Sequence, residues 1–228
     1  MALSAEGTVL CHREEFEQRN HATLLSGFIK DCLDRLRELE LNLDAVAVSM
    51  GPGSYTGLRI GLSEAKGLAY AMRLPLIGID TLQLLAVSVM FSTEEYPEGA
   101  LYAPMIDARR MEVFTAVYDQ ALSPLMEPAP LILNESSYEK YLEQGPVLFF
   151  GNGSDKAREV ITSLNAVFVP SIKPLAVDMT ALSELKWSRR EFLDLAYSTP
   201  WYRKEFQATS PRDPLASSSA SKSPRVSR

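Results

Sequence analysis

Apolar residues in the first hundred positions form short unbroken runs and longer stripes spaced three or four apart. Unbroken runs are typical of buried strands, and spaced stripes are typical of amphipathic helices. The elements predicted here are a hairpin of strands 1–4 and 8–12, a helix from 20 or 23 to 40, a strand at 44–50, a helix at 62–72, a strand at 74–80, and a helix at 82–91 capped by Thr81. The short links between these elements predict a layered α/β lobe.

The second half starts again with strands after a polar, helix-breaking segment at 94–99, which marks a boundary. The elements predicted here are a hairpin of strands 101–106 and 111–118, a proline-rich loop at 124–130, a short strand at 131–133, a helix at 136–143, a strand at 147–150, a helix at 154–164, a strand at 167–169 and a helix at 178–196. The last stretch is rich in Ser, Pro, Lys and Arg, which is typical of a disordered tail. We therefore predict a first lobe at 1–97, a second lobe at 98–207 and a tail at 208–228.

The least ordinary stretch is the glycine-rich turn between the strand at 44–50 and the helix that follows. Gly51 and Gly53 permit positive φ, and Pro52 fixes φ between them. The side-chain oxygen of either Ser54 or Thr56 can cap the new helix. The pattern therefore predicts a strand, a tight turn and a helix in direct succession.

A phosphate site is one interpretation of this turn. Arg59 and the free amides of the first helical turn could attract an anion. The glycine spacing departs from the dinucleotide fingerprint, and no Lys-Ser/Thr pair follows as in a Walker loop. Taken alone, the turn is a weak nucleotide signal.

Four small residues at four-residue spacing form one ridge of the following helix: Gly57, Gly61, Ala65 and Ala69. Each glycine costs a helix about 0.5–1 kcal/mol relative to alanine, so two on one ridge indicate a close approach by another backbone. That backbone can belong to the protein's own sheet or to a second helix or subunit. Spacing alone favours the sheet.

Composition limits the classes of function. The 228 residues are 46% hydrophobic and carry a net charge of −6, which argues against a broad nucleic-acid surface. The two cysteines, Cys11 and Cys32, match no disulfide framework or zinc spacing, which favours a reducing cytosol. With only two histidines and no ligand spacing, we expect no metal site. We also expect no membrane span and no secretory signal.

Several motifs lie in an order that resembles a known family. They are His21-Ala22 at the start of a helix, Gly-Pro-Gly-Ser-Tyr-Thr-Gly-Leu-Arg-Ile-Gly at 51–61, Lys-Gly-Leu-Ala at 66–69, Asp-Ala-Arg-Arg-Met-Glu-Val at 107–113 and Pro-Trp-Tyr-Arg at 200–203. Over about residues 1–207 the chain resembles the bacterial TsaB (YeaZ) family of tRNA threonylcarbamoyladenosine biosynthesis proteins, relatives of the glycoprotease-like TsaD. The resemblance implies the two-lobed α/β fold of actin, sugar-kinase and heat-shock ATPases. Family members normally begin with a complete strand, so the first strand is expected to be missing here.

For function, the resemblance implies a non-catalytic scaffold or activator that pairs with TsaD, and with the ATPase TsaE, in threonylcarbamoyl transfer to an adenosine of certain tRNAs. A homodimer is expected where TsaD is absent. We expect no cofactor on the chain itself, with ATP acting through TsaD and TsaE, tRNA met only through the complex, no membrane contact and a cytoplasmic location. The alternative is an ATPase or a glycoprotease-like enzyme in its own right, for which no nucleophile–base pair or ligand set is evident. A third hypothesis, a direct tRNA-binding module, conflicts with the acidic charge balance.

The resemblance also implies a partner surface on two first-lobe helices. The residues are Ala22, Leu25 and Ile29 in the first helix, and the ridge Gly57, Gly61, Ala65 and Ala69 in the second. It therefore favours the docking interpretation of the ridge. In the second lobe, Asp107 and Arg109 lie where the ATPases have a phosphate hairpin, which weakens the case for ATP binding. They either close the hairpin by a local ion pair or serve the function, and no catalytic residue is predicted.

Overall fold

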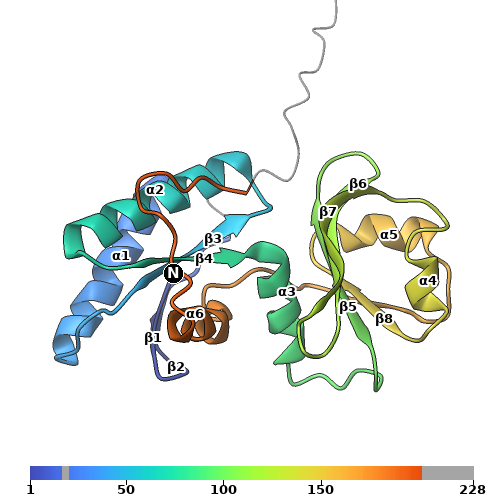
Figure 1. The fold of residues 1–228 in the computed structure, drawn as a ribbon, viewed down its shortest axis with the longest axis horizontal. Helices are drawn as coiled ribbons and strands as arrows, with labels where there is room; N and C mark the ends of the chain where they lie inside the picture. The colour runs from blue at the N-terminus through green and yellow to red at the C-terminus, as the bar shows by residue number, and fades with distance from the viewer. Residues whose placement is uncertain (17–20, 202–228) are drawn as a thin grey trace, which may run out of the picture.

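The computed structural model describes residues 1–16 and 21–201, with the side chains of residues 21–23 excepted. Two halves lie side by side, with α3 (Thr81–Met90) between them (Figure 1). The predicted tail at 208–228, and the last two residues of the motif at 200–203, lie outside the described residues.

The strands of the first lobe form two pairs. β1 (Ala2–Ala5) and β2 (Thr8–His12) make the predicted antiparallel hairpin. β3 (Val46–Gly51) runs parallel to β4 (Leu76–Asp80), whose five residues are all buried. An unbroken apolar run therefore becomes a strand covered on both faces, as expected for parallel pairing.

Two long helices complete this lobe and confirm the predicted helical segments. α1 (His21–Glu38) turns Cys32 and Leu36 inward at four-residue spacing, so its charged residues remain outside. α2 (Tyr55–Met72) starts directly after the glycine turn. It ends where Arg73 takes a left-handed conformation (φ 57°, ψ 43°), which stops the helix.

The two strand pairs belong to separate sheets, and an apolar cleft of about 650 Å³ lies between them. β1 and the start of β3 line its sides, with α1 and α6 (Met179–Ser188) contributing Ile29, Leu33 and Met179. Within the described ranges, neither β1 nor β3 pairs with a further strand. The sheet of the first lobe is therefore divided.

The second lobe contains one continuous five-stranded sheet in the order β7-β6-β5-β8-β9. β5 (Leu101–Asp107) and β6 (Glu112–Tyr118) form the predicted antiparallel hairpin. β8 (Val147–Phe150) runs parallel to β5, and β9 (Ala166–Val169) runs parallel to β8. Both short strands agree with the predicted runs.

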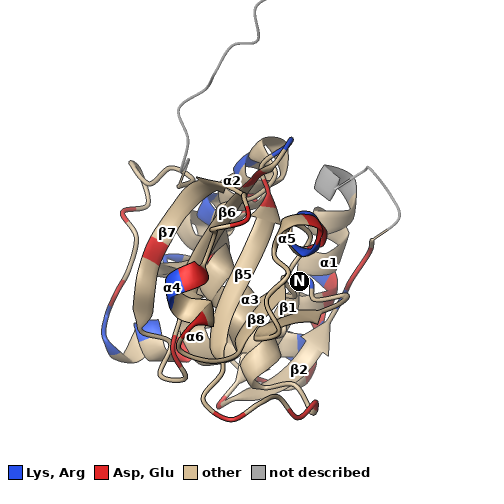
Figure 2. Cartoon of the chain, turned by 90° about the vertical axis from the view of Figure 1, so that its right-hand side faces the viewer, with Lys and Arg blue, Asp and Glu red and all other residues tan. Residues whose placement is uncertain are grey.

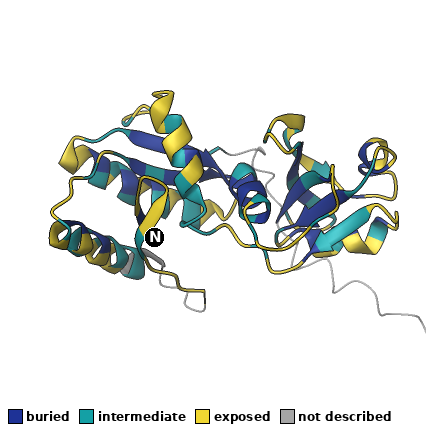
Figure 3. Cartoon of the chain, turned by 90° about the horizontal axis from the view of Figure 1, so that it is seen from below, coloured by how far each residue is buried: buried dark blue, intermediate teal, exposed yellow. Residues whose placement is uncertain are grey.

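One face of this sheet packs around Phe149, which is fully buried. Its ring meets Tyr138 edge-on at 5.1 Å and stacks on Phe168 at 5.3 Å between ring centroids. The helices α4 (Glu139–Leu142) and α5 (Ser154–Val160) are shorter than predicted. Figure 3 shows that buried residues concentrate in the strands of both halves.

The predicted proline-rich loop at 124–130 is wrong, because these residues belong to β7 (Pro124–Ile132). β7 is an outer strand that pairs with β6, with Pro124 opposite Tyr118 and Pro130 opposite Phe114. Proline lacks an N–H, so it is tolerated in a strand whose missing donor faces away from the sheet. An edge position therefore reconciles the prolines with a strand.

α3 is buried almost all round, because it packs between the halves. Leu82, Leu85 and Val89 contact the second lobe, whereas Leu84 and Val87 contact the first. The predicted cap is wrong by one residue. The Asp80 carboxylate, and not Thr81, caps α3 by accepting hydrogen bonds from Leu82 N at 2.7 Å and Gln83 N at 3.3 Å.

After β9 the chain returns to the first lobe. The predicted helix at 178–196 already ends at Ser188 as α6, which packs on β4. Leu193 N then donates to Leu76 O at 2.8 Å, and Trp201 N donates to Met50 O at 2.7 Å. The stretch 179–201, assigned to the second lobe from the sequence, therefore packs on the first.

Candidate functional site

The glycine turn after β3 packs between Leu58 of α2 and Trp201 near the end of the described chain. Gly51 has a φ of +106°, and a Cβ there would lie 3.0 Å from Leu58 Cδ1 and 3.2 Å from Trp201 O. The peptide bond between Gly51 and Pro52 is cis. Positive φ is thus confirmed at Gly51, whereas Gly53 does not adopt it. Glycine is strongly favoured at position 51, since a side chain there would be strained in conformation and crowded by Leu58 and Trp201.

The start of α2 resolves the choice between two caps. Ser54 Oγ accepts a hydrogen bond from Gly57 N at 3.3 Å, so Ser54 is the N-cap. Thr56 lies exposed in the first helical turn. Arg59 donates to Tyr55 Oη at 2.7 Å and lies 5.2 Å from the centre of the tyrosine ring. Arg59 is therefore oriented along the outer surface of the helix by Tyr55.

The small ridge of α2 faces the protein's own sheet. Ala69 is fully buried and Ala65 is 8% exposed, both in the core beside β3. A Cβ at Gly61 would lie 3.9 Å from Val48 Cγ2. This packing agrees with the interpretation that spacing alone favoured, a ridge against the sheet, and the burial of Ala65 and Ala69 argues against their part in a partner surface. Gly57 and Gly61 are half-buried, and their part in a partner surface stays a prediction.

The opposite side of α2 presents a stripe of exposed residues, which we call the outer stripe: Tyr55, Arg59, Ser63, Gly67 and Tyr70. The spacing of four, four, four and three keeps all five on one face of a helix. Tyr55 is 57% exposed and Tyr70 is 78% exposed. Tyr55 and Tyr70 at helical spacing from Arg59 were the sequence signal for this face, which the pattern of glycine and alanine did not reveal.

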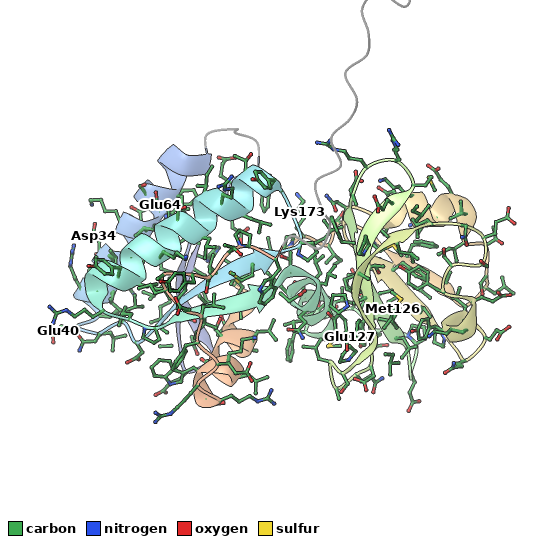
Figure 4. The ribbon with its side chains drawn as sticks, turned by 45° about the horizontal axis from the view of Figure 1, so that its top comes forward. Asp34, Glu40, Glu64, Met126, Glu127 and Lys173 are labelled. Atoms are coloured by element: carbon green, nitrogen blue, oxygen red, sulfur yellow. The ribbon has the colours of Figure 1, made fainter. Side chains whose placement is uncertain are left out.

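α1 lies beside α2 in the first lobe (Figures 1 and 4, where Asp34 labels α1 and Glu64 labels α2). Leu25 and Ile29 are half-buried, and Ile29 also lines the cleft of the divided sheet. Ala22 lies in α1, but its side chain is outside the described part. The part of these α1 residues in a partner surface stays a prediction.

In the second lobe, Asp107 closes the β5–β6 hairpin. Its Oδ1 accepts from Arg109 N at 2.6 Å and pairs with the Lys156 ammonium, and its own N–H donates to Asn152 Oδ1 at 3.0 Å. The hydrogen bond from Lys156 holds the pKa of Asp107 below its usual value. The local ion pair predicted between Asp107 and Arg109 is wrong, because the Asp107 carboxylate pairs with Lys156 and Arg109 contributes only its backbone N–H to the hairpin.

The glycine turn after β8 is built into the second-lobe sheet. Gly151 has a φ of +91°, and a Cβ there would lie 2.3 Å from Met105 O. A Cβ at Gly153 would lie 2.9 Å from Val113 Cγ1 and 3.1 Å from Asp107 N. This turn packs directly on β5 and β6, so its glycines serve close backbone packing.

Three general properties bear on function. Among the described residues, no three His, Cys, Asp or Glu side chains gather in a way that could hold a metal ion. No helix in the same part of the chain is long and apolar enough to cross a membrane. On α1, basic and acidic side chains pair with one another, as in Lys30–Asp34 and Arg35–Glu38. In Figure 2 basic and acidic positions are likewise interspersed.

Comparisons with known proteins agree with this fold. The family model of TsaD, tRNA N6-adenosine threonylcarbamoyltransferase, matches residues 14–130. A Pseudomonas aeruginosa crystal structure, described as similar to the peptidase YeaZ, superposes with a TM-score of 0.75 at 26% identity. It covers 89% of this chain and 93% of that one. A second structure, YeaZ from the same species, gives 0.73 at 26% identity over 88% and 92%. The chain is thus a two-lobed α/β protein of the TsaD-like, actin and sugar-kinase class, as predicted.

Curated relatives identify the branch of this class. The Bacillus subtilis protein TsaB is 30% identical over 165 residues, which cover 71% of this chain and 69% of that protein. Escherichia coli TsaB is 36% identical over 121 residues, covering 53% and 50%. Both are named tRNA threonylcarbamoyladenosine biosynthesis proteins. The chain belongs to the TsaB/YeaZ family.

Proposed function

We propose that this chain takes part in the formation of threonylcarbamoyladenosine in tRNA, as a non-catalytic subunit that docks on a TsaD-type protein and activates it. The observation that carries the proposal is its identity of 30–36% to proteins named for this biosynthesis. The match of the TsaD family model to the first lobe and the second-lobe hairpin also supports pairing between related folds. TsaE is the further partner that the proposal includes.

The docking surface proposed is the outer stripe of α2 together with the half-buried Leu25 and Ile29 of α1. Tyrosine and arginine are enriched where protein surfaces bind one another, and the outer stripe carries Tyr55, Arg59 and Tyr70. Ser63 and Gly67 lie between them and leave room for a second helix to approach. A second copy of the chain can use the same face, which is the proposed route to a homodimer in the absence of a TsaD-type partner.

The proposal assigns no chemistry or cofactor to the chain alone. The loop where related ATPases carry a phosphate hairpin holds Asp107 against Lys156, and the neighbouring turn after β8 packs its glycines on β5 and β6. ATP and tRNA are proposed to act through the assembled complex. The net charge of −6 and the paired charges of α1 support this division of labour, because tRNA binding needs clustered unpaired cations.

Co-elution with the TsaD-type protein of the same organism tests the docking surface. Gly67→Trp places a large side chain on the outer stripe, where no atom lies within 4 Å of the new Cβ. We expect binding to weaken about tenfold or more, with an unchanged circular dichroism spectrum. Leu164→Trp is the matched control, because Leu164 is fully exposed in the second lobe. Equal retention of the complex in both variants would contradict the assignment of this surface.

The biosynthetic role is tested separately in cells. In a strain that depends on this chain, Gly67→Trp is expected to lower the threonylcarbamoyladenosine content of bulk tRNA, measured by mass spectrometry of nucleosides, and Leu164→Trp is expected to leave it unchanged. Deletion of the chain with no change in this nucleoside would refute the role itself. Tight binding of ATP and Mg²⁺ by the isolated chain, measured by calorimetry, would instead favour an enzyme in its own right.

A further inference from the structure

The only two cysteines of the chain lie next to each other, although they are far apart in sequence. Cys11 is in β2 and Cys32 is in α1, and the Cys32 thiol donates to Cys11 Sγ across 3.7 Å. The two Sγ atoms of a disulfide are about 2.05 Å apart, so a modest rotation of the side chains would bring these sulfurs into bonding range. The fold, and not the sequence spacing, creates this pair.

The two thiols differ in their surroundings. Cys32 is 3% exposed and packs with Leu3 and Leu36. Burial, followed by the contact with Cys11, raises the pKa of Cys32 to about 11. A thiol in such a place reacts slowly with reagents in solution.

Cys11 lies on the other side of the pair, at the surface. It is half-buried and lines a charged groove of about 480 Å³ between β2 and α1. The Arg13 guanidinium, which is ion-paired with Asp31, reaches within 3.8 Å of Cys11 Sγ. The attacking sulfur in thiol–disulfide exchange must be accessible to the small disulfide, and Cys11 opens on this groove. One sulfur is thus accessible and the other is held behind it.

We propose that Cys11 and Cys32 form a reversible disulfide, with Cys11 as the attacking thiol and Cys32 as the resolving thiol. A small-molecule disulfide of the glutathione class supplies the oxidising equivalents. The bond would tie the β1–β2 hairpin to α1, on the far side of the cleft from β3. This site is independent of the proposed role in tRNA modification.

The exchange balances in two steps. The Cys11 thiolate attacks one sulfur of the small disulfide, and a mixed disulfide forms as one small thiolate leaves. The Cys32 sulfur then attacks Cys11 Sγ, and the second small thiolate leaves. The two protein thiols are oxidised, the small disulfide is reduced to two thiols, and the protons of Cys11 and Cys32 end on the released thiols.

Reduced full-length chain is incubated with oxidised glutathione and mapped by non-reducing peptide mass spectrometry. We expect a linked peptide pair containing Cys11 and Cys32, the simultaneous loss of both free thiols, and no disulfide between two chains. Thermal unfolding is expected to shift upward by roughly 5 °C, because the crosslink closes a loop in the unfolded chain. Dithiothreitol should reverse both changes. A stable glutathione adduct on Cys11 with Cys32 still free, or a disulfide between two chains, would overturn the proposal.

Two variants separate the roles of the thiols. Cys32→Ser should stop at the mixed disulfide on Cys11, whereas Cys11→Ser should leave Cys32 about tenfold or more slower to react, because it is buried. If Cys32 reacts in Cys11→Ser as fast as in the unmodified chain, the assigned order is wrong. The peptide map of the unmodified chain decides the pairing even if a variant does not fold.

Discussion

The unit of β3 and α2 and the unit of β8 and α5 share one plan, a buried strand, a glycine turn and a helix, but differ in what surrounds the turn. α2 runs for 18 residues and keeps its outer stripe exposed. α5 has 7 residues, and the turn before it is packed against the backbone of β5. The same local pattern therefore builds an outer surface in one lobe and an internal joint in the other.

The difference lies in the neighbours and not in the turn residues. In the first lobe, the turn meets the returning end of the chain, where Lys66 Nζ donates to Ser198 O at 2.7 Å and Trp201 binds β3. In the second lobe, the turn meets a continuous sheet and the Asp107–Lys156 pair. A glycine turn followed by a helix thus says little about a phosphate site until the atoms around it are known. The predictions below test how far the two units differ.

The largest effect on stability is expected in the unit of β8 and α5, which we call the second unit, the unit of β3 and α2 being the first. Gly151→Ala places a Cβ 2.3 Å from Met105 O at a positive φ, so we expect a loss of about 3–4 kcal/mol in the free energy of unfolding. Denaturant unfolding followed by circular dichroism measures it. Gly53→Ala is the matched control in the first unit, since its nearest contact is the Leu58 side chain at 3.9 Å. Equal losses in the two variants would remove the contrast.

The first turn should tolerate a methyl group better than the second. Gly51→Ala meets the movable end of Leu58 at 3.0 Å and Trp201 O at 3.2 Å, with a φ of +106°. We expect a loss of about 2 kcal/mol in the free energy of unfolding, between the losses for Gly151→Ala and Gly53→Ala. A larger loss than for Gly151→Ala would show that the first turn is the more rigid joint.

A smaller effect separates the two helix starts. Ser54 caps α2, whereas the residue before α5 is Gly153 and makes no side-chain cap. Ser54→Ala should cost about 1 kcal/mol of stability in the same unfolding measurement, because Gly57 N loses its acceptor. Thr56→Ala, two residues on, should have almost no effect. The reverse order would make Thr56 the cap.

The smallest effect is expected at the partly exposed pair of the second unit. Lys156→Met should cost less than about 1 kcal/mol at neutral pH, since solvent screens Asp107. Lys156 lowers the pKa of Asp107 in the folded chain, so its contribution is complete above the unfolded value near 3.9 and is lost as the pH falls below it. The stability difference between the variant and the unmodified chain should therefore shrink in acid. If Lys156→Met lowers the free energy of unfolding by the same amount in a chain that also carries Asp107→Asn, the loss does not come from the Asp107–Lys156 pair.

Local patterns predicted most of the elements, because runs such as 147–150 and the stripe of α1 reflect burial directly. The turn after β3 was also predictable from Gly51, Pro52 and Gly53, whereas the choice between Ser54 and Thr56 as the cap was not. Contacts between distant residues were not. Nothing near Asp107 in the sequence points to Lys156, and the prolines of β7 are acceptable only because β6 is the neighbour on one side.

The candidate surface illustrates the same limit. Spacing placed Gly57, Gly61, Ala65 and Ala69 on one ridge of α2 and favoured packing on the sheet, whereas the resemblance favoured docking. The burial of Ala69 and the exposure of Tyr70 settle that question, since neighbouring residues on a helix face different directions. The ridge and the outer stripe are opposite faces of the same helix, α2.

The outer strand of the second lobe also limits how copies of this protein can associate. β7 carries the exposed apolar side chains of Leu125 and Ile132 along an outer edge, and such an edge can seed the stacking of strands from one molecule to the next. Prolines interrupt the ladder of donors that this stacking needs, and the charge of Glu127 adds a further barrier (Figure 4, where Met126 and Glu127 label this strand). Growth into fibres along β7 is therefore opposed by the strand's own composition.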